Sequence, residues 1–275
     1  MKIKIFDNVV RKIFYKVAAL ENTVISALFL FIDIDTKCKK YAFLAFGLLL
    51  LASYLFSWQY ANKKKSISFR IGKTKVVVEE GDLFAETGLK VIPVNEFFDT
   101  HVGDNIIDPK SLHGLYLRNH LSQTIEELDA AITNSLGDSP VREIDAQRTV
   151  GKKIKYQLGT VYNDKNGFLL VAYTKFDKDN RAYLNPDDVM NCYMNMWNEI
   201  DKCRGNDSIC LTVLGSSGLV RNLYNHYSAQ QLVELVLGTF RASGINLSRG
   251  AELKIIIHKN MTSDINFLKL EDYSD

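Results

Sequence analysis

The hydrophobic positions divide the chain into an apolar N-terminal part and a longer part in which short apolar runs alternate with amphipathic ones. Residues 41–58 form an uncharged, mostly apolar run of about 18 residues, just long enough to cross the hydrocarbon core of a bilayer. Aromatic residues lie near both ends, as is typical of residues at a membrane–water interface. The run therefore predicts a membrane-spanning helix, followed by the basic triplet Lys63-Lys64-Lys65.

A second apolar segment, residues 13–34, is interrupted by polar residues in its first half. It fits either a weaker membrane span or an amphipathic helix at the interface, so one or two spans remain open. No small-residue cleavage site follows it, which disfavours a signal peptide. Basic residues on both outer flanks favour a hairpin with both ends in the cytoplasm, although the lysines at 37, 39 and 40 in the connecting loop count against it.

This pattern predicts two domains. Residues 1–62 form a membrane anchor with a helical hairpin, and residues 63–275 form a cytosolic domain at the inner face of the cell membrane. The basic triplet places the larger domain inside in either case.

The larger part reads as an α/β domain. Helices between apolar strands imply a mixed sheet with helices on both faces. The strand-like runs are 67–71, 75–80, 90–94, 209–214 and 253–257, with a hairpin formed by 155–163 and 167–173 around an Asn-Gly turn. The predicted helices are residues 115–136, a helix that starts at 185–186, and a helix between Ser228 and Gly244.

Composition narrows the function. The formal net charge is +2, which implies no dedicated nucleic-acid surface. The four cysteines show no C-x-x-C pair and no zinc-finger spacing, so we expect reduced thiols and no metal site. The sequence contains neither H-E-x-x-H nor G-x-S-x-G, and no catalytic residue or cofactor is assigned.

Polar and glycine-containing segments follow several predicted strands. Gly81-Asp82 follows one strand and Asn95 ends the next, and a loop then leads through Ser111 and His113 into a helix. Strand ends beside a helix N-terminus form a crevice where α/β proteins bind ligands, often through phosphate. Asp82 either caps the next segment or accepts a hydrogen bond from an exocyclic amine. Asn95 is a turn residue or a ligand contact, and His113 is a phosphate contact, a base or a loop residue.

A G-x-x-G segment, Gly215-Ser216-Ser217-Gly218, follows the strand 209–214. Small residues there let the backbone approach a phosphate, although such a turn is more often only a turn. No Gly-Lys-Ser/Thr follows, so it is not a P-loop. Arg221 is close enough in sequence to add a charge-assisted contact to a phosphate, the alternative being an ordinary exposed arginine.

Together these motifs resemble the macro-domain family, the ADP-ribose-binding α/β module. Residues 77–83 resemble its first strand and Gly-Asp turn, 92–95 its Val-Asn strand, and 212–219 its phosphate loop. The segments 81–84, 90–99, 111–114 and 158–161 resemble more specifically the divergent macro domain of the Thoeris antiphage effectors (protein A). In one class of these effectors that domain follows two membrane segments.

The resemblance implies a function. In such systems a TIR-domain partner converts NAD into an ADP-ribose-derived signal, in some cases ADP-ribose joined to histidine. The macro domain senses the signal, and the membrane part, within a homo-oligomer, disrupts the lipid bilayer. By the family pattern Asp82 takes the adenine amine, Asn95 shapes the ribose side, and 111–114 and 215–218 cradle the diphosphate.

The full predicted ligand-binding set is Asp82, Leu83, Asn95, Phe98, Asp99, Ser111, Leu112, His113, Gly114, Gly215, Ser216, Ser217, Gly218, Leu219 and Arg221. The Asn-Ala-Ala-Asn stretch of hydrolytic macro domains is here Asn95-Glu96-Phe97-Phe98, and the usual triple-glycine loop is absent. Both departures favour a reader of the signal over an ADP-ribosyl hydrolase. The alternatives are a membrane-tethered hydrolase with Asp99 or His113 as base, and a scaffold that binds no nucleotide.

Overall fold

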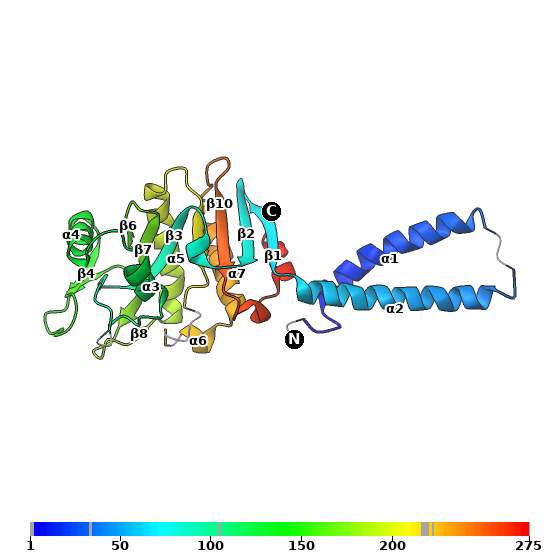
Figure 1. Cartoon of the computed structure of the whole chain (residues 1–275), viewed down its shortest axis with the longest axis horizontal. Helices are drawn as coiled ribbons and strands as arrows, with labels where there is room; N and C mark the ends of the chain where they lie inside the picture. The colour runs from blue at the N-terminus through cyan, green and yellow to red at the C-terminus, as the bar shows by residue number, and fades with distance from the viewer. Residues whose placement is uncertain (1–2, 33–34, 104–105, 216–219, 222, 275) are drawn as a thin grey trace. The chain divides into compact units, whose positions relative to one another are not determined.

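The computed structural model describes residues 3–32, 35–103, 106–215, 220–221 and 223–274 (Figure 1). The chain forms two compact units. One contains Met1–Ile67 and Ile265–Asp272, and the other contains Ser68–Asp264 and Tyr273–Asp275. The sequence pattern did not show that a C-terminal segment belongs to the first unit.

The first unit is a pair of helices, α1 (Asn8–Phe29) and α2 (Lys39–Lys63), that pack against each other (Figure 1). Side chains near the end of α2 hold the segment before α1. The Tyr54 hydroxyl donates to the Ile5 carbonyl at 2.7 Å, and the Trp58 indole N–H donates to the Ile3 carbonyl at 3.1 Å. The region predicted to contain a helical hairpin thus forms two helices in contact.

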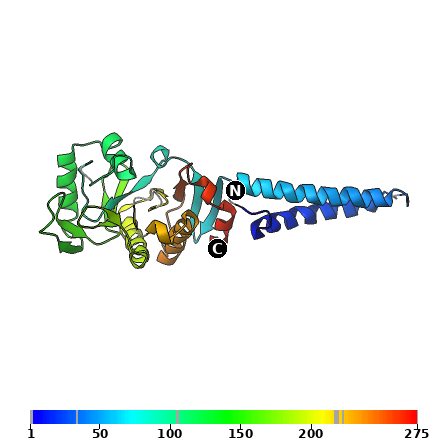
Figure 2. The same cartoon turned by 90° about the horizontal axis from the view of Figure 1, so that it is seen from below.

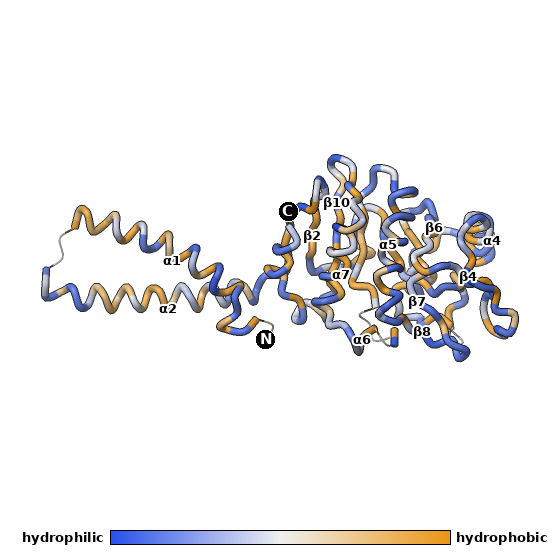
Figure 3. The backbone as a smooth tube through the Cα atoms, turned by 180° about the vertical axis from the view of Figure 1, so that it is seen from behind, coloured by the Kyte–Doolittle hydropathy of each residue, from blue (hydrophilic) through white to orange (hydrophobic). Residues whose placement is uncertain are grey.

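Within the described residues, α2 is the one helix whose length and composition suit a membrane span, and 11% of its apolar window is buried. Figure 3 shows a nearly continuous apolar run along α2, whereas polar positions interrupt α1. The buried side of α2 is made of small residues, Ser53, Ser57 and Ala61. The Ser53 hydroxyl donates to a carboxylate oxygen of Glu21 on α1. Small residues of this kind let two helices approach closely.

The second unit is built on an eight-stranded sheet in the order β1-β2-β10-β9-β3-β7-β6, with β8 paired to β7. Its five central strands, from β2 to β7 in this order, are all parallel, so their carboxyl ends lie along one edge. β6 is antiparallel to β7, and β4 and β5 form a separate two-stranded sheet. The strands are β1 (Ser66–Ile71), β2 (Thr74–Glu80), β3 (Leu89–Asn95), β4 (Val141–Ile144), β5 (Ile154–Tyr156), β6 (Val161–Asn163), β7 (Phe168–Phe176), β8 (Ala182–Tyr183), β9 (Ile209–Thr212) and β10 (Glu252–Ile257).

Helices cover both faces of this sheet, and Figure 2 shows the green and the yellow-to-orange helices on opposite sides of it. On one face α3 and α4 pack on Ile92, Val94 and Leu170. On the other α5 and α7 pack together, and the Trp197 indole N–H donates to Thr239 Oγ1 at 3.1 Å. The helices are α3 (Leu112–Asn119), α4 (Ile125–Ser135), α5 (Pro186–Cys203), α6 (Leu223–His226) and α7 (Ala229–Ser243), with short 3₁₀ turns η1 (Leu83–Ala85), η2 (Thr262–Asp264) and η3 (Phe267–Tyr273).

Three predicted elements differ from the structure. The single helix predicted over 115–136 is two helices, because Thr124 begins α4 with a capping box in which its hydroxyl accepts from the Glu127 N–H at 3.2 Å. The first arm of the predicted hairpin is divided between β5, which pairs with β4, and β6. The strand predicted over 209–214 ends at Thr212. The fold class, a mixed sheet with helices on both faces, is confirmed.

Candidate functional site

The sheet opens between β3 and β9 at its carboxyl edge. All four residues of β9 pair with β10, but only Leu89 and Lys90 of β3 pair with β9. The Leu89 N–H donates toward β9, to Ser208, and the Lys90 N–H donates toward β7, to Gly167. Alternation along β3 places the missing N–H of Pro93 on the β9 side. Proline cannot extend a strand ladder, so the two strands separate at this point.

The same two strands mark the point where the chain connections reverse. β3 leads to α3 and α4 on one face, and β9 leads to α7 on the other. In open α/β sheets ligands bind at this kind of switch point, outside the carboxyl ends of the strands. Along this edge, Asp82 follows β2, Gly215 follows β9, and Asn95 ends β3. β2 and β3 are three strand spacings apart, about 14 Å, which suits a long ligand.

Asn95 forms a tight turn at the end of β3. It is 3% exposed, and its side-chain oxygen accepts the N–H groups of Phe97 at 3.0 Å and Asp99 at 3.4 Å. Phe98 has a left-handed backbone (φ 52°), and its ring packs edge-on against Tyr156 in the core. The turn is therefore fixed from within, and the Phe98 ring points into the core.

The Asp99 carboxylate forms a buried ion pair with Arg148. It contacts Arg148 at 2.7 and 3.3 Å and accepts the Lys152 N–H at 2.7 Å. The Arg148 guanidinium also lies over the Phe97 ring at 3.7 Å and donates to Asn180 at 2.8 Å. Arg148 thus ties the turn after β3 to the β4–β5 connection and to the turn after β7. Sequence inspection missed Arg148, which has no local signature.

Asp82 is exposed at the end of β2, where one carboxylate oxygen accepts the Phe84 N–H at 3.0 Å. The sequence left open whether Asp82 caps the next segment or binds a ligand. It does cap η1, and its other oxygen accepts no hydrogen bond from the described residues. Leu83 is buried, and the Phe84 ring stacks on His120 at 4.1 Å.

α3 begins at Leu112, three residues before the predicted start at 115, with Ser111 as its N-cap, whose hydroxyl accepts the Gly114 N–H at 3.0 Å. Leu112 is half-buried beside it. A Cβ on Gly114 would lie 2.3 Å from the Asp108 carbonyl oxygen and 2.8 Å from Pro109 Cα. Gly114 is therefore needed for contact with its own loop, a reason independent of any phosphate.

His113 is buried in the first turn of α3, and its Nε2 has no hydrogen-bond partner among the residues that the structure describes. Burial, and secondarily the charge of Lys152, lower the pKa of His113 to about 3. The side chain is therefore neutral at physiological pH, with a pKa far below that of an effective general base at pH 7.

The pKa of His113 predicts acid sensitivity of the fold. The unfolded histidine takes up a proton below about pH 6.5, whereas the folded one stays neutral to about pH 3, so stability falls as the pH falls through this window. The expected loss is about 2 kcal/mol between pH 7 and pH 5. Urea unfolding at both pH values measures it. His113→Leu should lose this pH dependence, and the exposed-site control His258→Gln should keep it.

Glu96 complicates the total pH profile. It is 1% exposed at the end of β3, 3.1 Å from the guanidinium of Arg142 on β4. Burial raises its pKa, and the Arg142 charge lowers it less. Above its unfolded pKa near 4.5 the unfolded carboxyl ionises first, so Glu96 lowers stability as the pH rises. The contribution of His113 is therefore measured as the difference in the pH dependence of stability between the wild type and His113→Leu. An unchanged pH dependence in His113→Leu would contradict it.

The glycine segment is described at its two ends, and Ser216, Ser217, Gly218 and Leu219 lie outside the described residues. Gly215 has φ +80°, and a Cβ there would lie 2.2 Å from Leu223 Cδ2. The positive φ favours glycine at this position, and a larger residue would also require Leu223 to shift. At the other end, Arg221 pairs by backbone with β8 and by side chain with Asp177.

The comparisons with known proteins decide the family. The profile described as "Thoeris protein ThsA, Macro domain" matches residues 76–258. The chain is 32% identical over 255 residues to "Thoeris protein ThsA" of Bacillus amyloliquefaciens (strain Y2), which covers 91% of this chain and 85% of that protein. The chain belongs to the Thoeris protein ThsA family.

Solved structures of an Oceanobacillus iheyensis macrodomain are also similar. The one with ADP is 13% identical, and a point variant with ADPR is 14% identical. Each covers 76% of this chain, with 95% and 97% of the other chain covered, and each gives a TM-score of 0.48. The ThsA profile covers the stretch from β2 to just after β10 and so includes the whole opening between β3 and β9.

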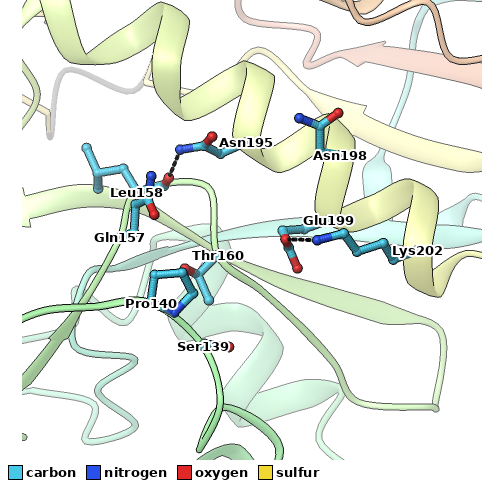
Figure 4. Close-up of a pocket in the computed structure, with 9 residues that line it drawn as sticks. All are labelled: Ser139, Pro140, Gln157, Leu158, Thr160, Asn195, Asn198, Glu199 and Lys202. Carbon is cyan, nitrogen blue, oxygen red and sulfur yellow. Dashed lines mark hydrogen bonds and ion pairs between the residues drawn. The ribbon is translucent and has the colours of Figure 1, made fainter.

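The ThsA macro domain also holds a cavity away from this edge. It measures about 150 Å³ and lies between α5 and the segment before β6 (Figure 4). Asn195 donates to the Leu158 carbonyl at 3.1 Å and Lys202 pairs with Glu199 at 2.6 Å in its wall. Ligand pockets usually measure about 300–1,000 Å³, so this cavity is too small for a nucleotide.

Proposed function

We propose that this chain is an antiphage effector whose macro domain binds an ADP-ribose derivative at the carboxyl edge of its sheet. Membership in the Thoeris protein ThsA family carries this proposal. The opening between β3 and β9 supports this location, because it lies at the switch point where α/β sheets bind ligands. The macro-domain family, whose members bind ADP-ribose, supports the proposed ligand class.

The proposed signal is made from NAD by a TIR-domain partner, and histidine-linked ADP-ribose is one candidate. The ligand would favour one assembly of the chain over another, since a ligand shifts an equilibrium only through different affinity for the two states. The helix pair α1–α2 would then cluster in the inner membrane and breach it. The length and composition of α2 support the membrane part of this proposal.

A reader of the signal fits these side chains better than a hydrolase does. Asp99, one candidate base, is held by Arg148 and by the Lys152 N–H. His113, the other, is buried with a pKa of about 3. A general base works best with a pKa near the working pH and within reach of its substrate.

Calorimetric titration of the full chain in detergent with ADP-ribose, histidine-linked ADP-ribose and NAD tests the proposal. Asp82→Asn is the informative variant, because its amide oxygen can still cap η1 while the second carboxylate oxygen is replaced by a donor. We expect tight binding of one derivative and a loss of about tenfold or more in this variant, the effect of a hydrogen bond to a charged group.

Asp108→Asn is the matched control. Asp108 is also exposed and also caps a backbone N–H, that of Lys110 at 2.7 Å, but it has no predicted ligand role. Equal losses in both variants would show a general effect of charge. No binding of any derivative would leave the scaffold as the better explanation, and turnover of an ADP-ribosylated substrate would favour the hydrolase.

A further inference from the structure

Arg221, a predicted phosphate contact, already pairs with a carboxylate in this structure. One of its guanidinium nitrogens, Nη2, donates to Asp177 Oδ2. Both side chains are partly exposed, 48% for Arg221 and 30% for Asp177. Exposed ion pairs contribute only about 0–1 kcal/mol, so this contact is weak enough for another anion to replace.

The two oxygens of Asp177 have separate roles. Oδ1 accepts the N–H groups of Asp179 and Arg181, both at 2.9 Å, and so forms the turn after β7. Oδ2 contacts Arg221. The same turn is also held from the other side by Arg148, which donates to Asn180. Loss of the Arg221 contact would therefore leave the turn formed.

The position of Arg221 places its side chain at the edge of the sheet that the ligand is proposed to occupy. Its N–H donates to the Ala182 carbonyl at 3.0 Å, and its carbonyl accepts the Leu184 N–H at 3.2 Å, beside β8. β8 pairs with the carboxyl end of β7, and β7 is the neighbour of β3. The other end of the glycine segment, Gly215, follows β9, on the opposite side of β3. The two described ends of the glycine segment, Gly215 and Arg221, thus lie on opposite sides of β3 in the strand order.

We propose that Asp177 is an internal competitor for the anionic ligand. A phosphate or diphosphate group would take the Arg221 guanidinium from Asp177, because arginine binds phosphate through strong, often two-pronged, charge-assisted hydrogen bonds. Asp177 would then set the threshold concentration at which the site responds. This inference rests on the proposed function and names the residue that tunes its affinity.

Titration calorimetry of the full chain in detergent tests it, with ADP-ribose and inorganic pyrophosphate as separate probes. Asp177→Asn retains an oxygen for the turn and removes the charge that faces Arg221. We expect both probes to bind about threefold to fivefold more tightly, the equivalent of up to about 1 kcal/mol. Asp179→Asn, an exposed residue of the same turn, makes the same change in net charge and should have a smaller effect.

Variants that lack Arg221 test whether the gain in affinity depends on this arginine. In Arg221→Gln both probes should bind more weakly, and adding Asp177→Asn should produce no further tightening. If Asp177→Asn does not fold, Asp177→Ser, whose hydroxyl can also accept the turn N–H groups, should show the same gain.

The outcomes separate the two proposals. Binding by the wild-type chain with no gain in the Asp177 variants beyond the Asp179 control overturns the competitor role alone. A gain that persists without Arg221 also overturns it. Failure of the wild-type chain to bind either probe overturns the competitor role, and the proposed function is overturned as well only if histidine-linked ADP-ribose and NAD also fail to bind.

Discussion

Arg148→Ala is expected to lower the free energy of unfolding by about 3–5 kcal/mol, the usual cost of removing one partner of a buried ion pair. Asp99 is 1% exposed, and without Arg148 its charge would stay in the interior with only the Lys152 N–H as a partner. The substitution also removes the cation over the Phe97 ring and the contacts with Asn180. The turn after β3, the β4–β5 connection and the turn after β7 would then no longer be linked through Arg148.

Thermal and urea unfolding of the full chain measure this effect, and we expect the melting temperature to fall on the order of 10 °C. Arg249→Ala is the control, because Arg249 is exposed and its removal should change stability by less than about 0.5 kcal/mol. Equal melting temperatures for the two variants would show that the Arg148–Asp99 pair does not hold these loops. Replacing Arg148 and Asp99 together by apolar residues should restore part of the loss.

Because α2 is proposed to span the membrane, Leu51→Arg is expected to release the chain from it. Leu51 lies near the middle of the apolar run of α2, and its side chain is exposed in the structure. An arginine at the centre of a spanning helix costs about 3–4 kcal/mol relative to leucine, which is roughly a hundredfold to thousandfold change in the partition equilibrium. The fraction of chain that stays in alkali-washed membranes should fall, and ligand-dependent leakage of vesicles should be lost.

Leu51→Ile is the matched variant and should behave as the wild type, since its size and hydropathy are nearly unchanged. Ligand binding by the second unit should survive Leu51→Arg in detergent, which separates a membrane defect from unfolding. If the arginine variant remains in washed membranes and still leaks vesicles, α2 does not span the bilayer in the way proposed.

The fold class and the ends of several elements could be predicted from the sequence because their signals are local. Apolar runs ending in Gly81 and Asn95, and capping residues such as Ser111 and Ser228, mark element ends by short-range chemistry. One such signal was missed, the Thr124 capping box that divides the predicted helix in two.

What could not be anticipated depends on pairs that are far apart in the chain. Asp99 and Arg148 are 49 residues apart, and neither has a neighbour that identifies the other. The contacts of Asp177 with Arg221 and of Glu21 with Ser53 are of the same kind. Pro93 is a different case. Its effect on the β3–β9 ladder follows from its missing N–H, but only once the neighbouring strand is known.

The short β3–β9 ladder has a mechanical consequence. The ladder divides the sheet into two halves. One half contains β1, β2, β10 and β9, and the other contains β3, β7 and β6. Two residue pairs at Leu89 and Lys90 join the halves, so these residues form a hinge between them. Asp82 follows β2 in one half of the sheet, and Asn95 ends β3 in the other half. A ligand that contacts both Asp82 and Asn95 would fix the angle between the two halves of the sheet. Ligands of different length would fix different angles, and the domain would then distinguish signals by their span as well as by their chemistry.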